Sequence, residues 1–589
     1  MVNVVNRLGL NTQCQRNSLF SKVTYYKDNP IQLSVYDRNA VDDQFSISME
    51  RIITNIAVIL ATVLGSSSCN NWLDGTESTS YLTDQIVWGE ASSVDLYVNG
   101  FYTYIHKYSQ FGDYQFGGSF TESLTDTFKY GSLSLGHKAG HPNNYVTNPE
   151  AITTAGCLYG IWGTAYENIR RINEFLVSLD KYSTFSDEQN AIWEGQARFF
   201  RAFIYFQLAK RHPQGVILYT DLNMTNNKAR SSAKDMWDLI EADLDYAASV
   251  LPESWNKDNS GRVSKNAVYA FKSRAMLYAE RWQSAYDAAQ QVITSLQYSL
   301  VPDYNDACKG GNSESILEFR YSVNGPNHNF DQDYVPLCDG YDYGALGTPT
   351  QEMVECYEKF DGSKFDWSGY HDGSVTVRPA YEVLEPRFAA TVIYNGCKWK
   401  GNTMDCSVAG EYGSFVEYGS VPYSYGQTTT GYFLRKLVDE NHTDLRGVKS
   451  AQTWVEIRYA EVLLNAAEAA YRAGMTADVY QKLMDQVRAR VGLPRKSLSG
   501  EEWFEAYRNE RKVELAYEGQ LFWDMRRWGL AHIEYTGYRV HGFKIKGTMF
   551  EYVSCDLADR RFLQRLYCLP IPDEELQNNN LIEQYDEWK

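Results

Sequence analysis

Long stretches in which apolar residues return every three or four positions are the feature that most constrains the fold of this 589-residue chain. Such spacing places apolar side chains on one face of an α-helix. In Asp187–Arg211 that face consists of Trp193, Ala197, Phe200, Ile204 and Leu208. Related patterns predict helical blocks over Tyr81–His106, Tyr159–Leu179, Ala233–Leu251, Ser264–Leu296, Thr453–Arg490 and Glu501–Trp528. The chain is therefore predicted to be mainly α-helical.

Two of these blocks have the pattern of paired helices. In Ser264–Leu296, small alanines stand where two helices must approach closely, so we expect a helix pair. In Glu461–Gly474 a helix ends at a glycine suited to a C-terminal cap, and Val479–Val491 supplies the next helix. Both pairs resemble tetratricopeptide repeats, although the repeat period is not kept cleanly. Such pairs usually form scaffolds or docking surfaces.

The segment Ser299–Lys449 differs from these helical blocks. It is rich in Gly, Asp and Tyr, and it carries the short β-like runs Ser315–Phe319 and Ala389–Tyr394. Loops held on a rigid scaffold are where binding residues concentrate. We therefore predict a helical scaffold with a large loop-rich insertion that carries the binding residues.

Cys69 follows a segment that has the three parts of a secretion signal. Arg51 is a basic start, Ile52–Leu64 is uncharged and mostly apolar, and small residues from Gly65 onward precede the cysteine. The apolar run would make about 20 Å of helix, which is short of the about 30 Å hydrocarbon core of a bilayer. A cysteine at the cleavage point predicts lipidation, so we expect an exported lipoprotein. The alternative is a buried core helix followed by an ordinary cysteine.

The predicted signal lies well inside the chain, directly after Met49. We therefore interpret residues 1–48 as a product of start-codon choice or a disordered segment, and residues 49–68 as the signal peptide. The alternative is a cytoplasmic extension anchored by Ile52–Leu64. Residues 69–589 are predicted to form a single domain, with an N-terminal part at about 69–300, the insertion at about 299–449 and a C-terminal part at about 300–589.

Charge and aromatic content narrow the class of partner. The formal net charge is −18, and an acidic surface repels phosphate backbones, so we expect no nucleic-acid partner. The chain has 45 tyrosines, many of them in Gly-, Ser-, Asn- or Asp-rich stretches. A tyrosine offers a flat apolar face with a polar tip, which suits the C–H face and hydroxyl rim of a sugar. The alternative for any single tyrosine is packing at the edge of the core.

Two loop clusters alternate aromatic rings with carboxylates or amides and are the candidate ligand contacts. Rings could stack on sugar faces while carboxylates accept hydrogen bonds from hydroxyls. The first cluster, Tyr108–Phe116, supplies Asp113, Tyr114 and Phe116. The second, Asp331–Tyr343, supplies Asp331, Tyr334, Asp339, Tyr341 and Tyr343. Trp399, between Lys398 and Lys400, is a further candidate as an exposed aromatic residue.

Signatures of catalysis and of metal binding are missing from the sequence. It has no Gly-x-Ser-x-Gly, His-Glu-x-x-His or Cys-x-x-Cys motif and no phosphate-binding glycine loop. We therefore predict a protein that is not an enzyme, with no catalytic residue, cofactor or metal. A calcium site at Asp331, Asp333 and Asp339 stays an alternative, although the bidentate glutamate of a calcium-binding loop is missing. A glycosidase also stays open, because a sequence does not show the separation of two carboxylates.

Five motifs carry a specific family resemblance. They are Cys69-Asn-Asn-Trp-Leu-Asp74, the helix Trp193–Leu208 with Gly215 beyond it, Ile457–Glu468, Glu510–Gly529 and Tyr567–Leu576. Together they bracket nearly all of residues 69–589, and the chain resembles the SusD/RagB family. The resemblance implies tetratricopeptide-like helix pairs packed against an irregular, loop-rich ligand-binding half with minor β structure.

The resemblance also implies a function and a location. It implies a surface lipoprotein of a Gram-negative bacterium, held to the outer membrane by its lipid, that captures nutrient glycans without catalysis. The implied partner is a SusC-like TonB-dependent transporter, to which the glycan is delivered. The alternative class is a tetratricopeptide-type adaptor that binds a peptide or protein.

The motif Glu510–Gly529 is expected to hold the fold rather than the ligand. Arg511, Glu514 and Glu518 fall at spacings of three and four residues, so we expect ion pairs along one helix.

Overall fold

The computed structural model describes residues 84–112, 121–131, 142–223, 227–336, 339, 344–410, 415–418 and 426–589. The chain divides into two compact units, Met1–Leu82 and Thr83–Lys589, and every described residue belongs to the second. Cys69 and the predicted signal peptide lie outside the described residues. Within the described part, no helix is both long enough and apolar enough to cross a membrane.

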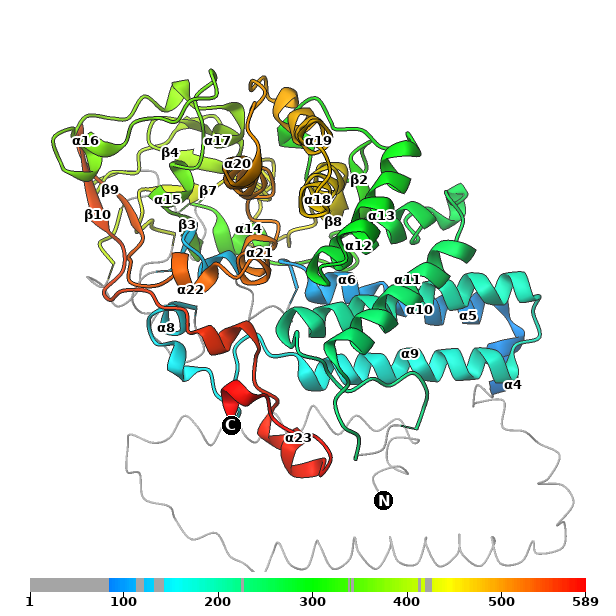
Figure 1. Ribbon diagram of the computed structural model, residues 1–589. Helices are drawn as coiled ribbons and strands as arrows, with labels where there is room; N and C mark the ends of the chain where they lie inside the picture. Colours follow the sequence, from blue (N-terminus) through cyan, green and yellow to red (C-terminus); the bar gives the residue numbers. More distant parts are fainter. Residues whose placement is uncertain are drawn as a thin grey trace, which may run out of the picture. The chain divides into compact units, whose positions relative to one another are not determined.

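Helices that pack side by side form the first part of this unit (Figure 1). The serines Ser186, Ser232 and Ser264 each accept a backbone N–H bond in the first turn of the following helix, which fixes where three of the helices begin. The longest, Asp187–Arg211, matches its predicted range and buries the predicted apolar stripe. The helices are α4 (Asp84–Gly89), α5 (Ala91–Phe101), α6 (Thr103–Tyr108), α8 (Pro142–Thr147), α9 (Trp162–Tyr182), α10 (Asp187–Arg211), α11 (Ala233–Val250), α12 (Lys265–Tyr278) and α13 (Trp282–Thr294).

Both predicted helix pairs are present. The first is α12 with α13, and the second is α18 (Tyr459–Arg472) with α19 (Ala477–Arg490). Gly474 has a positive φ of 73°, and the Met475 N–H bonds to the Ala470 carbonyl, so the predicted glycine cap ends α18. The pairs stack because α13 and α12 both contact α18. The expectation of tetratricopeptide-like helix pairs is confirmed.

The last predicted helical block is broken into separate helices. They are α20 (Gly500–Glu514) and α21 (Leu521–Arg527). Two short helices follow this block, α22 (Ala531–Glu534) and, near the C-terminus, α23 (Asp573–Asn578). Between α20 and α21, Tyr517 and Gly519 have positive φ values of 64° and 76°. A Cβ atom at Gly519 would lie 2.3 Å from Gln110 Nε2, so the turn requires glycine there.

The loop-rich segment contains short helices and contributes to small antiparallel sheets. The helices are α14 (Phe330–Tyr334), α15 (Gln351–Val354), α16 (Ser368–His371) and α17 (Pro386–Thr391). Each sheet in the described residues has two strands: β1 (Phe128–Tyr130) with β3 (Gly347–Pro349), β2 (Ser315–Phe319) with β8 (Trp454–Arg458), β4 (Val392–Tyr394) with β7 (Tyr432–Leu434), β5 (Lys398–Trp399) with β6 (Asn402–Thr403), and β9 (His541–Lys546) with β10 (Met549–Ser554).

Two boundaries differ from the sequence prediction. The block predicted as helix from Thr453 begins instead with strand β8, because Trp454–Arg458 pairs with β2. Ala389–Tyr394, predicted as β-like, is divided between the end of α17 and strand β4. In both places a tertiary partner decides the local structure.

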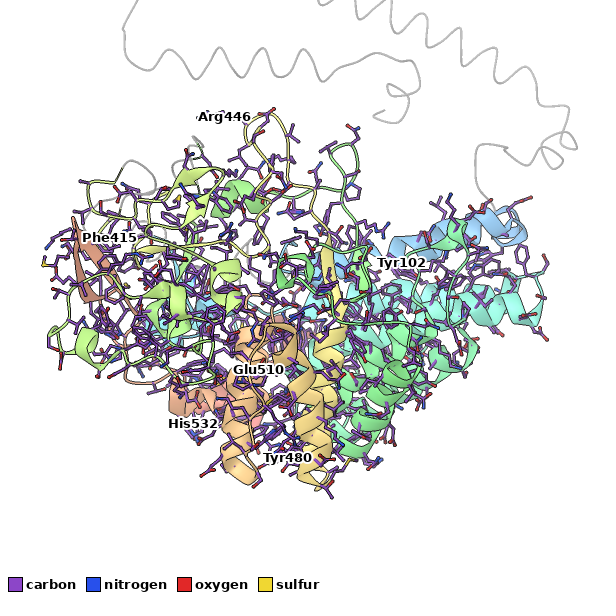
Figure 2. The ribbon with its side chains drawn as sticks, turned by 90° about the horizontal axis from the view of Figure 1, so that it is seen from above. Tyr102, Phe415, Arg446, Tyr480, Glu510 and His532 are labelled. Atoms are coloured by element: carbon purple, nitrogen blue, oxygen red, sulfur yellow. The ribbon has the colours of Figure 1, made fainter. Side chains whose placement is uncertain are left out.

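Buried ion pairs join the loop-rich segment to α20. Arg387 of α17 bonds to Glu510 at 2.6 Å and to Glu514 at 3.0 Å. Figure 2 shows Glu510 centrally, on α20. The expectation of ion pairs along one helix was wrong: Arg511 pairs with Asp524 of α21 at 2.6 Å, and Glu518 lies beyond the end of α20.

Candidate functional site

A cavity of about 650 Å³ opens where the loop-rich segment meets the residues before β8. Small-molecule sites typically measure about 300–1,000 Å³. Its lining combines hydroxyl, amide, carboxylate and cationic groups, which come from segments far apart in the sequence. The lining residues are Tyr304, Asn305, Cys308, Lys309, Ala390, Lys400, Arg435, Lys436, Leu437, Val438, Asp439, Glu440, Asn441, Gln452 and Thr453.

Glu440 organises one wall of this cavity. Its Oε2 accepts a hydrogen bond from Arg435 Nη2 at 2.9 Å, and its Oε1 accepts one from the Lys400 backbone N–H at 3.2 Å. The Lys400 ammonium lies 3.1 Å from Asp339 Oδ2. The wall therefore presents donors and acceptors in fixed positions, and its cations face carboxylates.

Lys436 and Tyr304 form a second, more deeply buried part of the lining. The Lys436 ammonium donates to the Tyr304 hydroxyl at 2.7 Å and to Glu518 Oε1 at 2.6 Å. Burial alone would lower the pKa of Lys436, but the Glu518 carboxylate holds that pKa above its usual value. Lys309 also pairs with a carboxylate, that of Asp306, at 2.7 Å. All four lining cations are thus matched by acidic partners.

Asp331, predicted as a ligand contact, supports this cavity from behind. Its side chain is fully buried and accepts hydrogen bonds from the Asp439 N–H at 2.9 Å, Gln452 Nε2 at 2.8 Å and His442 Nδ1 at 2.7 Å. The bond to Asp331 raises the pKa of His442. Asp331 therefore lies behind the lining, with its oxygens bound to the lining residues Asp439 and Gln452, and ligand contact by Asp331 stays a prediction.

Asp339 and Trp399 are brought together at the edge of the same cavity. The Trp399 indole N–H lies 3.3 Å from Asp339 Oδ1. Trp399 is only 1% exposed, so the prediction of an exposed aromatic residue was wrong. Its neighbour Lys400 lines the cavity instead, from the turn between β5 and β6, where its φ is positive at 45°.

Tyr334 is also buried rather than available to a ligand. It is 1% exposed, and its ring packs on Phe330 with 4.7 Å between centroids. Phe330 in turn contacts Phe111 at 4.6 Å. Phe111 belongs to the first predicted cluster and Phe330 directly precedes the second, so the structure joins the two clusters at their beginnings.

The other predicted contacts, Asp113, Tyr114, Phe116, Tyr341 and Tyr343, lie outside the described residues and stay predictions. Two backbone hydrogen bonds join described residues from distant parts of the chain. The Gly426 N–H bonds to the Gly344 carbonyl at 2.9 Å, and the Gly131 N–H bonds to the Leu346 carbonyl at 2.6 Å.

The sequence analysis missed Arg435, Glu440 and Asn441 as lining residues. A usable signal was present, because the polar run Asp439-Glu440-Asn441 stands between two stretches that become the buried strands β7 and β8. Polar residues between two buried strands often lie at a sheet edge near a ligand site.

The geometry does not favour the calcium alternative. In the described residues, no group of three or more His, Cys, Asp or Glu side chains is placed to hold a metal ion. Burial also raises the pKa of Asp333 to about 7, which favours a protonated carboxyl over a charged ligand for a cation.

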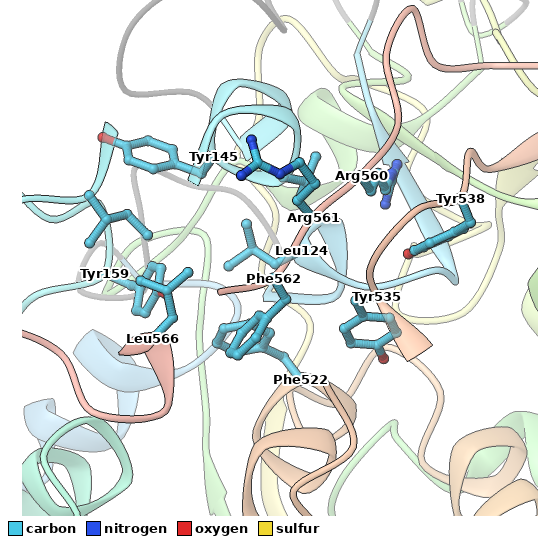
Figure 3. A pocket seen from close by; sticks show the side chains of 12 residues that line it. Leu124, Tyr145, Tyr159, Phe522, Tyr535, Tyr538, Arg560, Arg561, Phe562 and Leu566 are labelled. Carbon is cyan, nitrogen blue, oxygen red and sulfur yellow. The ribbon is translucent and has the colours of Figure 1, made fainter. Parts of the chain in front are cut away.

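A second cavity is too small for a sugar. It has a volume of about 20 Å³, which is room for about one water molecule. Figure 3 shows its lining, where Tyr535, Tyr538, Phe522 and Phe562 surround the space near Arg560. We therefore place the candidate site at the larger cavity around Glu440.

Comparison with known proteins identifies the family. One family model, described as the SusD family, matches residues 313–588, and another, described as starch-binding associating with outer membrane, matches residues 119–277. SusD-like protein P2 of Formosa agariphila is 24% identical over 452 residues, which cover 72% of this chain and 80% of that protein.

Solved structures agree with this assignment. A SusD-like protein from Bacteroides fragilis NCTC 9343 is 27% identical with a TM-score of 0.73, covering 86% of this chain and 98% of that one. A protein described as a laminarin-binding SusD-like protein shares the fold, with 23% identity and a TM-score of 0.58, over 84% of this chain and 99% of that one. The helix pairs, the loop-rich segment and both family models agree, and the chain belongs to the SusD/RagB family.

Proposed function

We propose that this protein is a cell-surface lipoprotein that binds a nutrient glycan without cleaving it and delivers it to a TonB-dependent transporter in the outer membrane. The observation that carries the proposal is the cavity of about 650 Å³ around Glu440 in a chain of the SusD/RagB family. Its paired donors and acceptors suit a neutral, hydroxyl-rich ligand. The laminarin-binding relative supports a glycan as that ligand.

The bonds made by the cavity's carboxylates support binding without cleavage. A typical glycosidase needs one carboxyl that delivers a proton and a second that acts as base or nucleophile. Glu440 is bound to Arg435 and to the Lys400 N–H, and Asp439 Oδ1 accepts the Asn441 N–H at 2.9 Å. Both acids are engaged in shaping the lining, which supports a binding role.

The location rests on the sequence around Cys69 and on the family model whose description names association with the outer membrane. A lipid on Cys69 would tether the protein at the cell surface. A Cys69→Ser variant is expected to leave the membrane fraction and to lose metabolic labelling by a fatty-acid analogue. Unchanged labelling would contradict the lipoprotein assignment.

Glycan capture is tested with protein that begins just after Cys69. We would screen it on a glycan array and by affinity electrophoresis, and assay reducing ends on every polysaccharide retained. Retention without new reducing ends supports the proposal. New reducing ends from pure protein contradict the non-catalytic role, and no retention on any polysaccharide contradicts glycan capture.

Delivery to a transporter is tested by affinity purification from outer membranes of the native host. Recovery of a TonB-dependent transporter with the tagged protein supports the partnership. Its absence after mild crosslinking would contradict it.

A further inference from the structure

A third cavity lies beside the candidate site. Its volume is about 330 Å³, and it opens between the end of α5, the loop before α12 and the end of strand β2. Most of its lining is polar, with two aromatic residues among amides, a hydroxyl and paired charges. The lining residues are Asn99, Tyr102, Asp258, Asn259, Ser260, Gly261, Arg262, Glu318, Phe319 and Arg320. Figure 2 shows Tyr102 beside the first helices, on the helical side of the described unit.

The two cavities share a wall at Gly310. A Cβ atom at Gly310 would lie 2.6 Å from Thr453 Cγ2 and 2.8 Å from Glu318 Oε2. Thr453 lines the first cavity and Glu318 lines the other, so a residue of each lining lies against the same side of Gly310. The Gly311 N–H also donates to Glu318 Oε2 at 2.7 Å.

The β2–β8 ladder brings the same two linings together. Phe319 stands opposite Trp454 in the register, and Trp454 directly follows Thr453. A Cβ atom at the neighbouring Gly311 would lie 3.6 Å from Arg320 Nη2. The chain between Lys309, which lines the first cavity, and Arg320, which lines the other, therefore forms a short common rim.

The lining of this third cavity has the chemistry of a sugar contact. The Phe319 ring is half-buried and stacks on His106, with 5.6 Å between centroids and 27° between planes. His106 Nδ1 is in turn 2.6 Å from the Tyr321 hydroxyl, which holds the stack in place. A fixed ring beside the exposed side chain of Asn99 and the half-buried amide of Asn259 can offer one apolar face and adjacent hydrogen-bonding groups.

Its charges are balanced, as they are in the first cavity. Arg320 lies 2.6 Å from Glu318, and Arg262 lies 3.2 Å from Asp95. A phosphate or sulfate would meet no unpaired cation here, whereas a neutral polyol needs none.

We propose that the cavity at Phe319 continues the glycan site at Glu440, so that the ligand is a neutral oligosaccharide long enough to cross the Gly310–Gly311 rim and occupy both. This inference rests on the proposed function. Phe319 supplies the stacking face of the second subsite, and the amide of Asn259 supplies hydrogen bonds.

The test measures affinity against chain length. Size-fractionated oligosaccharides, from disaccharides upward, are prepared from starch, laminarin, xylan and mannan and titrated by calorimetry into protein that begins after Cys69. We expect affinity to rise with length until both subsites are filled. Phe319→Ala and Asn259→Ala should each weaken the longest bound oligosaccharide by about tenfold and leave the shortest one unchanged.

Two controls separate the subsites from general damage. Phe360, an aromatic residue that is 53% exposed and outside both linings, should tolerate Phe360→Ala without any change in affinity. Asn259 is half-buried at the end of the short 3-10 helix Lys257–Asn259, and Asn259→Ala removes a smaller side chain than Phe319→Ala, so it keeps the test valid if Phe319→Ala fails to fold.

The outcomes distinguish the two proposals. If wild-type protein binds none of the four series, both glycan capture and its extension are overturned. If it binds but affinity does not grow with length, or if the Phe319 and Asn259 variants weaken short and long chains equally, glycan capture stands and the extended site is overturned.

Discussion

Arg458, the last residue of β8, donates through Nη1 to Glu514 Oε1 at 2.6 Å, although the two residues are 56 positions apart. Their side chains are 1% and 0% exposed. Arg458 also bonds to Glu314 of the segment before β2 at 2.7 Å and to Glu518 at 2.7 Å. One guanidinium thus compensates three buried carboxylates that come from different parts of the chain.

Removal of this guanidinium should strongly destabilise the protein. We expect Arg458→Met to lower the free energy of unfolding by about 3–5 kcal/mol, because it removes the one cation that Glu314, Glu514 and Glu518 share. The remaining cations Arg490, Arg387 and Lys436 compensate these carboxylates only in part. Urea denaturation followed by circular dichroism measures the change. Arg170→Met is the matched control: Arg170 is 66% exposed and pairs only with Glu174, so less than about 1 kcal/mol is expected. Equal effects of the two substitutions would contradict the role given to Arg458.

Glu122 should make stability depend on pH. It is buried, and burial raises the pKa of its carboxyl from 4.5 to about 7 in the folded protein. Between these two values the folded state holds a proton that the unfolded state has lost, so the stability contributed by this group falls as pH rises from about 4.5 to about 7.

The variant Glu122→Gln tests this titration. Its amide can still accept the Gly519 N–H, which now bonds to Glu122 Oε1 at 2.9 Å. We expect equal stability of variant and wild type near pH 4.5 and a gain of up to about 3 kcal/mol for the variant at pH 8. Urea titrations at several pH values provide the comparison, and a constant difference across pH would rule out the titration of Glu122.

Trp399 should affect stability rather than only ligand affinity. Because the side chain is 1% exposed, Trp399→Ala is expected to cost about 3–5 kcal/mol of unfolding free energy. Thermal and urea unfolding measure that loss, and Phe360→Ala, at an exposed aromatic position, is the control. If Trp399→Ala keeps its stability but loses glycan affinity, the result would contradict a mainly structural role and support a ligand contact by Trp399.

Glu440 should affect binding more than stability. Its side chain is 39% exposed, yet it holds Arg435 and the Lys400 N–H in place. We expect Glu440→Ala to weaken the glycan retained by wild type by about tenfold, since misplaced donors lose their hydrogen bonds. Glu440→Gln keeps an acceptor and should lose less. Calorimetric titration compares the variants, and unchanged affinity in Glu440→Ala would move the site away from this cavity.

Periodicity predicted the long helices because each buries a continuous apolar face that leaves a mark in the sequence. Helix α10 begins and ends at the predicted residues, and Gly474 ends α18 as predicted. The strand Trp454–Arg458 was predicted as helix, because its structure depends on a partner strand, Ser315–Phe319, that lies far earlier in the chain. The break at Tyr517 and Gly519 depends in the same way on Gln110.

The sequence indicated the loop-rich segment that holds the candidate cavity, but not the residues that line it. Asp331 contacts the lining residue Asp439, and Asp339 contacts the lining residue Lys400 as well as Trp399. Their exposure could not be predicted, because Asp331 is covered by Asp439 and Gln452, more than a hundred residues further along. Aromatic and acidic composition alone does not distinguish a ligand contact from the layer that supports it.

The ion pairs from Arg387 to Glu510 and from Lys436 to Glu518 have a consequence for protein engineering. The loop-rich segment supplies the cation of each pair, and α20 or the turn after it supplies the carboxylate. Either part without the other would therefore contain buried charges that lack these partners. A graft that exchanges the whole segment between relatives would strand charges in the interior unless the acidic residues of α20 travel with it. Ligand preference is therefore best redesigned at the cavity surface, for example at the exposed Asn441, where a new side chain meets water instead of the buried ion pairs.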